Sequence, residues 1–326
     1  MLKIYQTVGD ELHQVESIDG KGLWVELVNP TENEIVQVAE ATNLLPEFLK
    51  AALDEEERPR IETDEGQVLI VINIPFSHGD NGDYNYDTIP LGIVINDHVV
   101  VTVCLRENPL YAELHSLRVA KGIHTQKKTR FLLQILFYNA ALFLKYLRLI
   151  DRKSNEIERV LHGSTKNEEL IRLLNLGKSL TYFTTSLRSN EIVLEKLLKS
   201  KLVKVGDEDA QVTSRILKMY EEDEDLLEDV ITENKQAIEM AEVYSSILAG
   251  TMDAFATIIS NNQNTVMKFL ASVTIIMALP TMVASFYGMN VALPFQRSPY
   301  AFVGTLVFSG LLVAGATYMM TKRKML

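Results

Sequence analysis

Two long segments without charge, close to the C-terminus, constrain the fold more than any other feature of this sequence. Phe269 to Tyr287 contains no charged residue and no histidine, and Ala301 to Thr321 is equally free of charge. Each has about the length that a helix needs to cross a hydrocarbon core of about 30 Å, where a buried charge costs roughly 2.5–3.5 kcal/mol. We therefore predict two transmembrane helices. The alternative is a buried helical hairpin in a soluble protein.

The first segment carries small and polar residues along one face of the predicted helix. Steps of three and four residues backwards from Gly288 define this small-residue stripe: Asn264, Met267, Ala271, Thr274, Ala278, Thr281 and Ser285. Such spacing is typical of a helix that packs against partner helices. The stripe predicts either close helix packing within the chain or a water-filled pore. A pore would require several copies of the chain, because two helices cannot enclose one.

Short motifs on both sides of this stripe carry a family resemblance. Tyr287-Gly288-Met289-Asn290, placed between two apolar helices, resembles the signature of the CorA family of divalent-metal channels. Asn264-Thr265-Val266-Met267-Lys268 resembles the family's Asn-x-x-Met-Lys, and Lys322-Arg323-Lys324 resembles its basic tail. Trp24-Val25-Glu26-Leu27 and Arg58-Pro59-Arg60-Ile61-Glu62 also look like family positions, so the likeness covers nearly the whole chain.

The resemblance implies a homopentameric funnel that passes Mg²⁺, and often Co²⁺ or Ni²⁺, into the cytosol. Some relatives export Zn²⁺, so a Zn²⁺ exporter on the same scaffold is an alternative. A membrane-anchored coiled-coil scaffold is a third possibility, but it leaves the small-residue stripe unexplained. The outer connector, 288–300, contains Arg297 and no acidic residue, unlike that of many relatives, so the ion preference and the direction of transport stay open.

The resemblance also assigns roles along the pore. Gly288, Met289 and Asn290 would form the selectivity filter, in which five Asn290 amides hold a hydrated Mg²⁺, and Gly288 would let the backbone turn sharply. Met267 and Leu270 would form a hydrophobic gate near the cytosolic end. The other pore-lining positions would be Asn264, Thr274, Ala278, Thr281 and Ser285.

By the same resemblance, cytosolic Mg²⁺ would close the channel at a regulatory site on the stalk. Asp253 has the family's spacing of eleven residues from the asparagine of Asn-x-x-Met-Lys, and Asp229 matches a second acidic position. Lys50 stands where the partner carboxylate is expected, and Asp54 or Glu55 could replace it if the helix is long enough. A bound cation would cancel the repulsion between neighbouring carboxylates.

Charge and cysteine content fit this interpretation. All 43 acidic residues lie at or before Asp253, which suits cations and does not indicate nucleic acid as a partner. Cys104 is the only cysteine, so a reducing compartment fits. The N-terminus has no apolar signal sequence. Lys268 and the basic tail 322–324 predict a multi-pass protein of the cytoplasmic membrane with both termini in the cytosol.

No catalytic motif is present. None of the six histidines pairs at i, i+4 with another His or Cys, and the sequence has no P-loop and no nucleophile elbow. We expect neither enzyme activity nor an organic cofactor. Transport would run down the electrochemical gradient, which gives a divalent cation about 4.6 kcal/mol per 100 mV.

The predicted fold class is α+β, with a mixed α/β domain followed by long helices. Thr31 and Glu34 form a capping box for a first helix, and a second starts near Pro46 and ends near Asp54. Strands are predicted at 2–7, 22–28, 68–74, 88–95 and 99–105. The expected parts are a cytosolic domain (1–125), a helical hairpin (126–206), a stalk helix (207–266), a first membrane helix (267–287), an outer loop (288–300), a second membrane helix (301–321) and a tail (322–326). The stalk and first membrane helix would be one rod.

Overall fold

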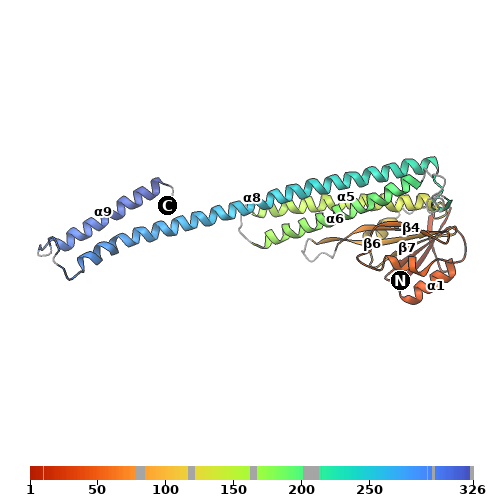
Figure 1. Ribbon diagram of the computed structural model, residues 1–326, viewed down its shortest axis with the longest axis horizontal. Helices are drawn as coiled ribbons and strands as arrows, with labels where there is room; N and C mark the ends of the chain where they lie inside the picture. Colours follow the sequence, from red (N-terminus) through yellow and green to blue (C-terminus); the bar gives the residue numbers. More distant parts are fainter. Residues whose placement is uncertain are drawn as a thin grey trace. The chain divides into compact units, whose positions relative to one another are not determined.

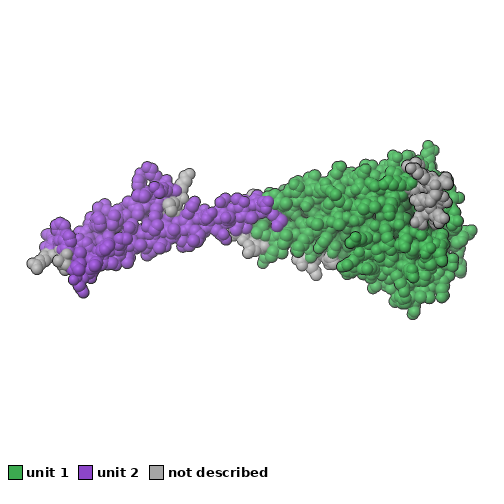
Figure 2. All heavy atoms as spheres, viewed as in Figure 1, with its two compact units in different colours: residues 1–250 green, residues 251–326 purple. Residues whose placement is uncertain are grey.

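The structure is a computed structural model that describes residues 1–326 except 10, 78–84, 117–121, 162–166, 201–212, 214, 292, 296–297 and 324–326. It divides into two compact units, Met1–Gly250 and Thr251–Leu326 (Figure 2). Arg297, Lys324 and the start of the expected stalk at 207–212 lie outside the described residues.

Unit 1 is built on a seven-stranded sheet with the strand order β2-β1-β3-β7-β6-β5-β4. Its strands are β1 (Leu2–Val8), β2 (Glu11–Val15), β3 (Leu23–Val28), β4 (Arg60–Asp64), β5 (Gln67–Ser77), β6 (Tyr86–Ile95) and β7 (Val99–Cys104). β3 and β7 are parallel, and every other neighbouring pair is antiparallel. The five predicted strands are confirmed, whereas β2 and β4 were not predicted from the sequence.

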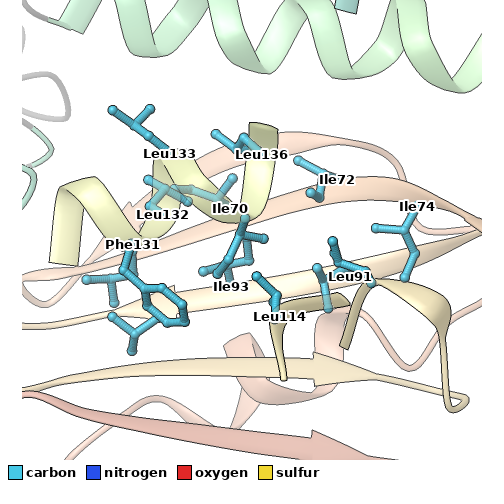
Figure 3. Packing of buried hydrophobic residues seen from close by; sticks show 14 of the residues in the cluster. Ile70, Ile72, Ile74, Leu91, Ile93, Leu114, Phe131, Leu132, Leu133 and Leu136 are labelled. Atoms are coloured by element: carbon cyan, nitrogen blue, oxygen red, sulfur yellow. The ribbon is translucent and has the colours of Figure 1, made fainter. Parts of the chain in front are cut away.

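The central strands are buried on both faces, because alternate residues point to opposite sides of the sheet. Ile70, Ile72 and Ile74 belong to the hydrophobic core that also contains Leu132 and Leu136 (Figure 3). Leu69 and Val71, which alternate with these isoleucines along β5, belong to the second core on the other face. A continuous apolar run on β5 therefore serves two cores at once.

One face of the sheet is covered by α1 (Glu32–Thr42) and α2 (Pro46–Ala51) (Figure 1). The predicted capping box is confirmed: Thr31 Oγ1 accepts from the Glu34 N–H at 3.3 Å, and Glu34 Oε2 accepts from the Thr31 N–H at 2.7 Å. The second helix ends at Ala51, so the predicted end near Asp54 is wrong. Asp54 instead accepts the Glu56 N–H at 3.0 Å in a turn after the helix.

The opposite face is covered by α3 (Pro109–Leu114), α5 (Lys128–Leu161) and α6 (Asn167–Ser200) (Figure 1). α5 is long and apolar enough to count as a third candidate membrane span, which corrects the expectation of only two such segments. More than half of its apolar window is buried inside unit 1, whereas little of the α8 window and none of the α9 window is buried. The apolar residues of α5 thus serve the core of unit 1.

A polar clamp joins β5 to α6. β4 pairs with β5 only as far as Val71, so Asn73 has no neighbouring strand on that side. Asn190 of α6 takes the place of a strand: its Oδ1 accepts the Asn73 N–H and its Nδ2 donates to the Asn73 carbonyl, both at 2.8 Å. Asn139 of α5 donates to the same carbonyl at 3.0 Å. These bonds satisfy backbone groups at an otherwise open sheet edge.

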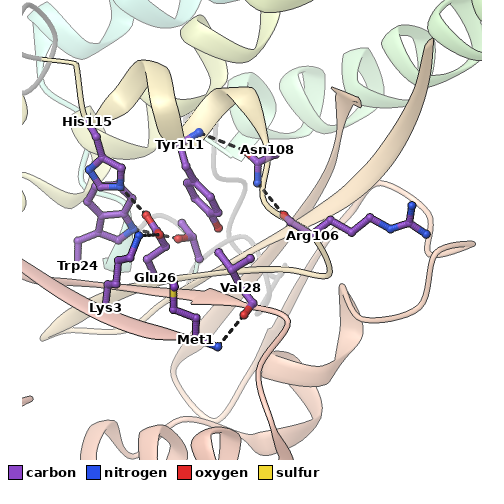
Figure 4. Close-up of polar contacts among 10 residues, drawn as sticks. Met1, Lys3, Trp24, Glu26, Val28, Arg106, Asn108, Tyr111 and His115 are labelled. Carbon is purple, nitrogen blue, oxygen red and sulfur yellow. Dashed lines mark hydrogen bonds and ion pairs between the residues drawn. The ribbon is translucent and has the colours of Figure 1, made fainter. Parts of the chain in front are cut away.

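A buried carboxylate lies between the sheet and α3 (Figure 4). Glu26 is 2% exposed, and its Oε2 lies 2.6 Å from His115 Nε2, while Lys3 Nζ lies 3.7 Å from its Oε1. His115 also stacks on Trp24. Burial, followed by the charge of Glu26, raises the pKa of Tyr5 to about 12, so this tyrosine is neutral under physiological conditions. The buried charge is therefore balanced within unit 1.

The last long helix of unit 1, α8 (Glu221–Tyr287), begins later than predicted. Residues 217–220 are not helical, so the pattern expected to run unbroken from about Asp207 is interrupted. The reason is a cap at the new start: Asp223 Oδ2 accepts the Tyr220 N–H at 3.1 Å, and the Asp223 N–H donates to the Tyr220 carbonyl at 2.9 Å. Four acidic residues in the first turn complement the helix dipole.

Unit 2 contains the remainder of α8 and α9 (Ala301–Lys322). α8 continues through Pro280 to Tyr287, as the sequence predicted. α9 has no buried residue, and large apolar side chains such as Met277, Phe302 and Leu311 are exposed. A helix pair with this surface needs an apolar surrounding or further helices to cover it.

Candidate functional site

The small-residue stripe lies on the continuous helix α8, and all seven members are exposed in the single chain. Met267 is 64% exposed, and Leu270, at the edge of the stripe, is 52% exposed. These two apolar side chains lie near the middle of the part of α8 that belongs to unit 2. Within the described chain nothing packs on this face, so the alternative of helix packing inside one chain does not account for the stripe.

A different face of α8 is the one that is covered within unit 2. Ser272 and Val283 are buried there, and Ile276 and Leu279 between them are half-buried. With 3.6 residues per turn, this face lies roughly opposite the small-residue stripe. Half-buried residues recur at helical spacing on α9 as well: Ala301, Thr305, Ser309, Leu312 and Ala316. We infer that α8 and α9 pack against each other through these faces and leave the stripe uncovered.

The stripe's threonines present oxygen atoms rather than protons. Thr274 Oγ1 donates its hydrogen to the Leu270 carbonyl at 2.8 Å, and Thr281 Oγ1 donates to the Met277 carbonyl at 3.1 Å. The hydroxyl protons are thus used by the helix itself, and the lone pairs of the oxygens stay available as acceptors. Acceptors of this kind suit the outward-pointing hydrogens of a hydrated cation.

Asn290 lies three residues after the end of α8 at Tyr287. The last turn closes with the Gly288 N–H donating to the Ala284 carbonyl at 2.9 Å and the Met289 N–H donating to the Phe286 carbonyl at 3.3 Å. Gly288, Met289 and Asn290 are all exposed. The negative end of the helix dipole lies at this point.

The expectation for Gly288 needs correction, because its φ is not positive. Glycine's special conformational freedom is therefore not used at the end of α8. Among the described residues of the connector, Phe295 has a positive φ, of 63°. The chain turns there on an aromatic residue that no sequence rule would have selected.

A shallow aromatic hollow lies beside the Tyr-Gly-Met-Asn motif and was not predicted from the sequence. It has a volume of about 440 Å³, and its lining includes Tyr287, Phe295, Tyr300 and Phe308. The available signal was the grouping of aromatic residues at the ends of two apolar segments, which is typical of a membrane–water interface.

The three carboxylates proposed for regulation are all exposed: Asp229 and Asp253 on α8, and Asp54 after α2. Lys50, at the position of the missing partner carboxylate, forms an ion pair with Glu32 of α1. Among the described residues of one chain, no group of three or more His, Cys, Asp or Glu side chains could hold a metal ion. A sensing site at Asp253 would therefore need residues from a second copy.

The comparison with known proteins decides the family. The model of the family described as CorA-like Mg²⁺ transporter protein matches residues 19–323. The chain belongs to the CorA family. The cobalt/magnesium transport protein CorA of Methanocaldococcus jannaschii is 28% identical to it, over 90% of this chain and 88% of that protein. The resemblance seen in the Tyr-Gly-Met-Asn motif and its flanks is thereby confirmed.

Solved structures share the fold. The complete structure of the CorA magnesium transporter from Methanocaldococcus jannaschii superposes with a TM-score of 0.82 at 24% identity and covers 98% of this chain and 97% of that one. The cytoplasmic domain of ZntB from Vibrio parahaemolyticus gives a TM-score of 0.56 at 14% identity, over 80% of this chain and 97% of that domain. The CorA fold, with an α/β domain and long helices, is therefore shown.

Proposed function

We propose that this chain forms a homopentameric channel that passes Mg²⁺, and by the same route Co²⁺ or Ni²⁺, across the cytoplasmic membrane into the cytosol. The observation that carries the proposal is the free small-residue stripe on α8, opposite the face that is covered within unit 2. Exposed apolar residues elsewhere on α8 and α9 suit lipid, but a row of Asn, Thr and Ser does not. Several copies around an axis would turn this row towards water.

Asn290 would form the outer filter of such a pore. A ring of neutral amide oxygens can bind a hydrated Mg²⁺ weakly enough to release it, whereas a ring of carboxylates would hold the ion harder. The Thr281 and Thr274 hydroxyl oxygens, whose protons are donated to the helix, would continue the acceptor row inwards. The small side chains of Ala278 and Ser285 would leave space between the polar rings. Asn264 would form the innermost polar ring.

Gating is proposed near the cytosolic end of the row. Met267 and Leu270 would form the hydrophobic constriction, which stops ions by excluding water. Internal Mg²⁺ would close it by binding at Asp253, with Asp229 and Asp54 as further carboxylates, so that the ion is both cargo and regulator. Both termini would lie in the cytosol, since Lys268 and the basic end of α9 mark the inner side of the membrane.

The side chains of unit 2 favour Mg²⁺ over Zn²⁺. Residues 251–326 contain no histidine and no cysteine, which are the ligands that Zn²⁺ prefers. The polar members of the stripe offer amide and hydroxyl oxygens, which suit a hard cation. Zn²⁺ export on the same scaffold has no comparable observation in its favour.

Uptake by proteoliposomes tests this proposal. The purified chain would be reconstituted with a Mg²⁺-sensitive dye inside, and the membrane potential would be set with K⁺ and valinomycin. We expect Mg²⁺ entry that rises with an inside-negative potential, together with a detergent-corrected mass of five chains. A mass of one chain would contradict the pore, and uptake of Zn²⁺ without Mg²⁺ would contradict the ion assignment.

A further inference from the structure

Unit 1 contains a cavity that the transport proposal does not use. It has a volume of about 850 Å³ and lies between the start of α5 and the residues around the start of α8. This volume falls within the roughly 300–1,000 Å³ of pockets that hold small organic ligands. Its charged lining consists of five basic and four acidic side chains: Lys127, Lys128, Arg130, Arg215, Lys218, Asp97, Glu221, Glu222 and Asp223.

Most of the acidic side chains already have partners. Glu222 forms an ion pair with Arg130, and Asp223 is buried and accepts the Tyr220 N–H. Asp97 lies 3.9 Å from Lys128. Of the four carboxylates, Glu221 is the one whose side chain has neither an ion pair nor a hydrogen bond within the described part of the chain.

Some of the basic side chains of the cavity have no acidic partner. Lys127 and Lys218 form no ion pair within the described ranges, although Lys127 lies near enough to help lower the pKa of Glu222. Lys128 is half-buried: burial lowers its pKa, Asp97 opposes this, and the positive charge of Lys218 lowers it further. Two lysines whose positive charges oppose each other thus line one cavity in a protein whose net charge is −11. An anion between them would remove this repulsion.

An aromatic ring stands at the same cavity. Tyr220 lines it and is 70% exposed, more than any other large aromatic side chain among the described residues of unit 1. Its backbone N–H is held by Asp223, so the residue's position is fixed while its ring remains open. An exposed ring of this kind offers a stacking surface for a planar base.

We propose that this cavity binds the magnesium complex of a nucleoside triphosphate. Lys127, Lys128 and Lys218 would hold the phosphates through charge-assisted hydrogen bonds. Tyr220 would stack on the base. Glu221 would accept from the waters of the phosphate-bound Mg²⁺, which normally keeps several of them. Because Glu221 is the first residue of α8, an occupied cavity would brace the start of the helix that carries the small-residue stripe.

Calorimetric titration of the full-length protein in detergent tests this site. Mg·ATP and Mg·tripolyphosphate are titrated separately at one constant free Mg²⁺ concentration, so that binding of the free ion elsewhere adds nothing. The variants are Lys127→Gln combined with Lys218→Gln, and Tyr220→Ala. Lys178→Gln is the matched control, since Lys178 is an exposed lysine of α6 that does not line the cavity. All substituted side chains are exposed, so we expect the variants to fold. Circular dichroism would check this.

We expect the wild-type protein and the Lys178→Gln control to bind Mg·ATP equally. The double lysine variant should bind it about 30-fold more weakly, and Tyr220→Ala about tenfold more weakly. Mg·tripolyphosphate should bind more weakly than Mg·ATP and be insensitive to Tyr220→Ala.

Absence of Mg·ATP binding, or binding that the double lysine variant retains in full, would overturn the site. Equal affinity for both ligands would overturn the assignment of a nucleoside. No ion flux enters these measurements, so their failure would leave the transport proposal untouched.

Discussion

The two units of this protein differ in how far their apolar residues are buried. Unit 1 buries them on both faces of its sheet and even encloses α5, a helix apolar enough to cross a membrane. In unit 2, little of the apolar window of α8 and none of that of α9 is buried, and the polar stripe on α8 is exposed. Unit 1 therefore buries much of its apolar surface itself, whereas unit 2 leaves apolar surface that lipid or further copies of the chain would have to cover.

Because of this difference, substitutions in the two units should have different effects. Substitutions in unit 1 should change stability, because its polar groups are bonded to each other, as in the clamp of Asn73 by Asn190. Substitutions on the stripe or at Asn290 should change transport with little effect on folding, because these side chains contact almost nothing in the single chain.

The largest expected effect is at Asn290. Asn290→Ala should reduce Mg²⁺ uptake by proteoliposomes to the level of empty vesicles, because the filter loses its ring of amide oxygens. Asn261→Ala, on an exposed position of α8 outside the stripe, is the control and should conduct normally. Both variants should keep the wild-type mass in detergent. Wild-type uptake by Asn290→Ala would remove this residue from the pathway.

The next effect concerns regulation. Asp253→Lys would place a fixed positive charge where a metal ion is proposed to bind, so uptake should stay low whatever the internal Mg²⁺ concentration. Protection of α8 from protease should no longer require added Mg²⁺. Glu239→Lys makes the same charge change at another exposed position of α8 and should remain inhibited by Mg²⁺. If Asp253→Lys keeps normal inhibition, sensing lies elsewhere.

A smaller effect should appear in stability alone. Asn190→Leu leaves the Asn73 N–H without its partner at the open edge of β5, and should lower the free energy of unfolding of unit 1 by about 2–3 kcal/mol. Ser189→Ala, at the neighbouring half-buried position, removes only a hydroxyl that donates to the Thr185 carbonyl of its own helix, and should change it by less than about 0.5 kcal/mol. Denaturation can be followed by the fluorescence of Trp24, the only tryptophan. Equal stability of the two variants would show that the clamp contributes little.

Much of the fold could be predicted because local signals agreed with tertiary structure. Thr31 and Glu34 are close in sequence and form the predicted cap, and the apolar runs of β5, β6 and β7 are long enough to indicate strands. β4 was missed because Arg60-Ile61-Glu62-Thr63-Asp64 is polar and its pairing with β5 stabilises it. The start of α8 was missed because Asp223, one of several adjacent acidic residues, acts as a cap through a side-chain bond that composition cannot show.

The candidate site, like the fold, could be predicted from the sequence only in part. Helical spacing alone placed Thr274, Ala278 and Thr281 on one face, and the structure shows that face exposed. Which face of α9 is half-buried could not be predicted from the sequence, because α9 is apolar all round. The pairing of Lys50 with Glu32 joins two helices and was equally hidden. Contacts between copies lie beyond one chain, so the pore and the sensing site remain predictions.

Cysteine accessibility tests the central claim, that the stripe lines the ion pathway, most directly. Ser285→Cys places a thiol on the stripe, and Val283→Cys places one on the covered face of α8. The native Cys104 is buried, and burial raises the pKa of its thiol, so it should not react. A membrane-impermeant thiosulfonate should block Mg²⁺ uptake through Ser285→Cys and leave Val283→Cys unaffected. Unchanged uptake through labelled Ser285→Cys, or equal block of both variants, would contradict the account.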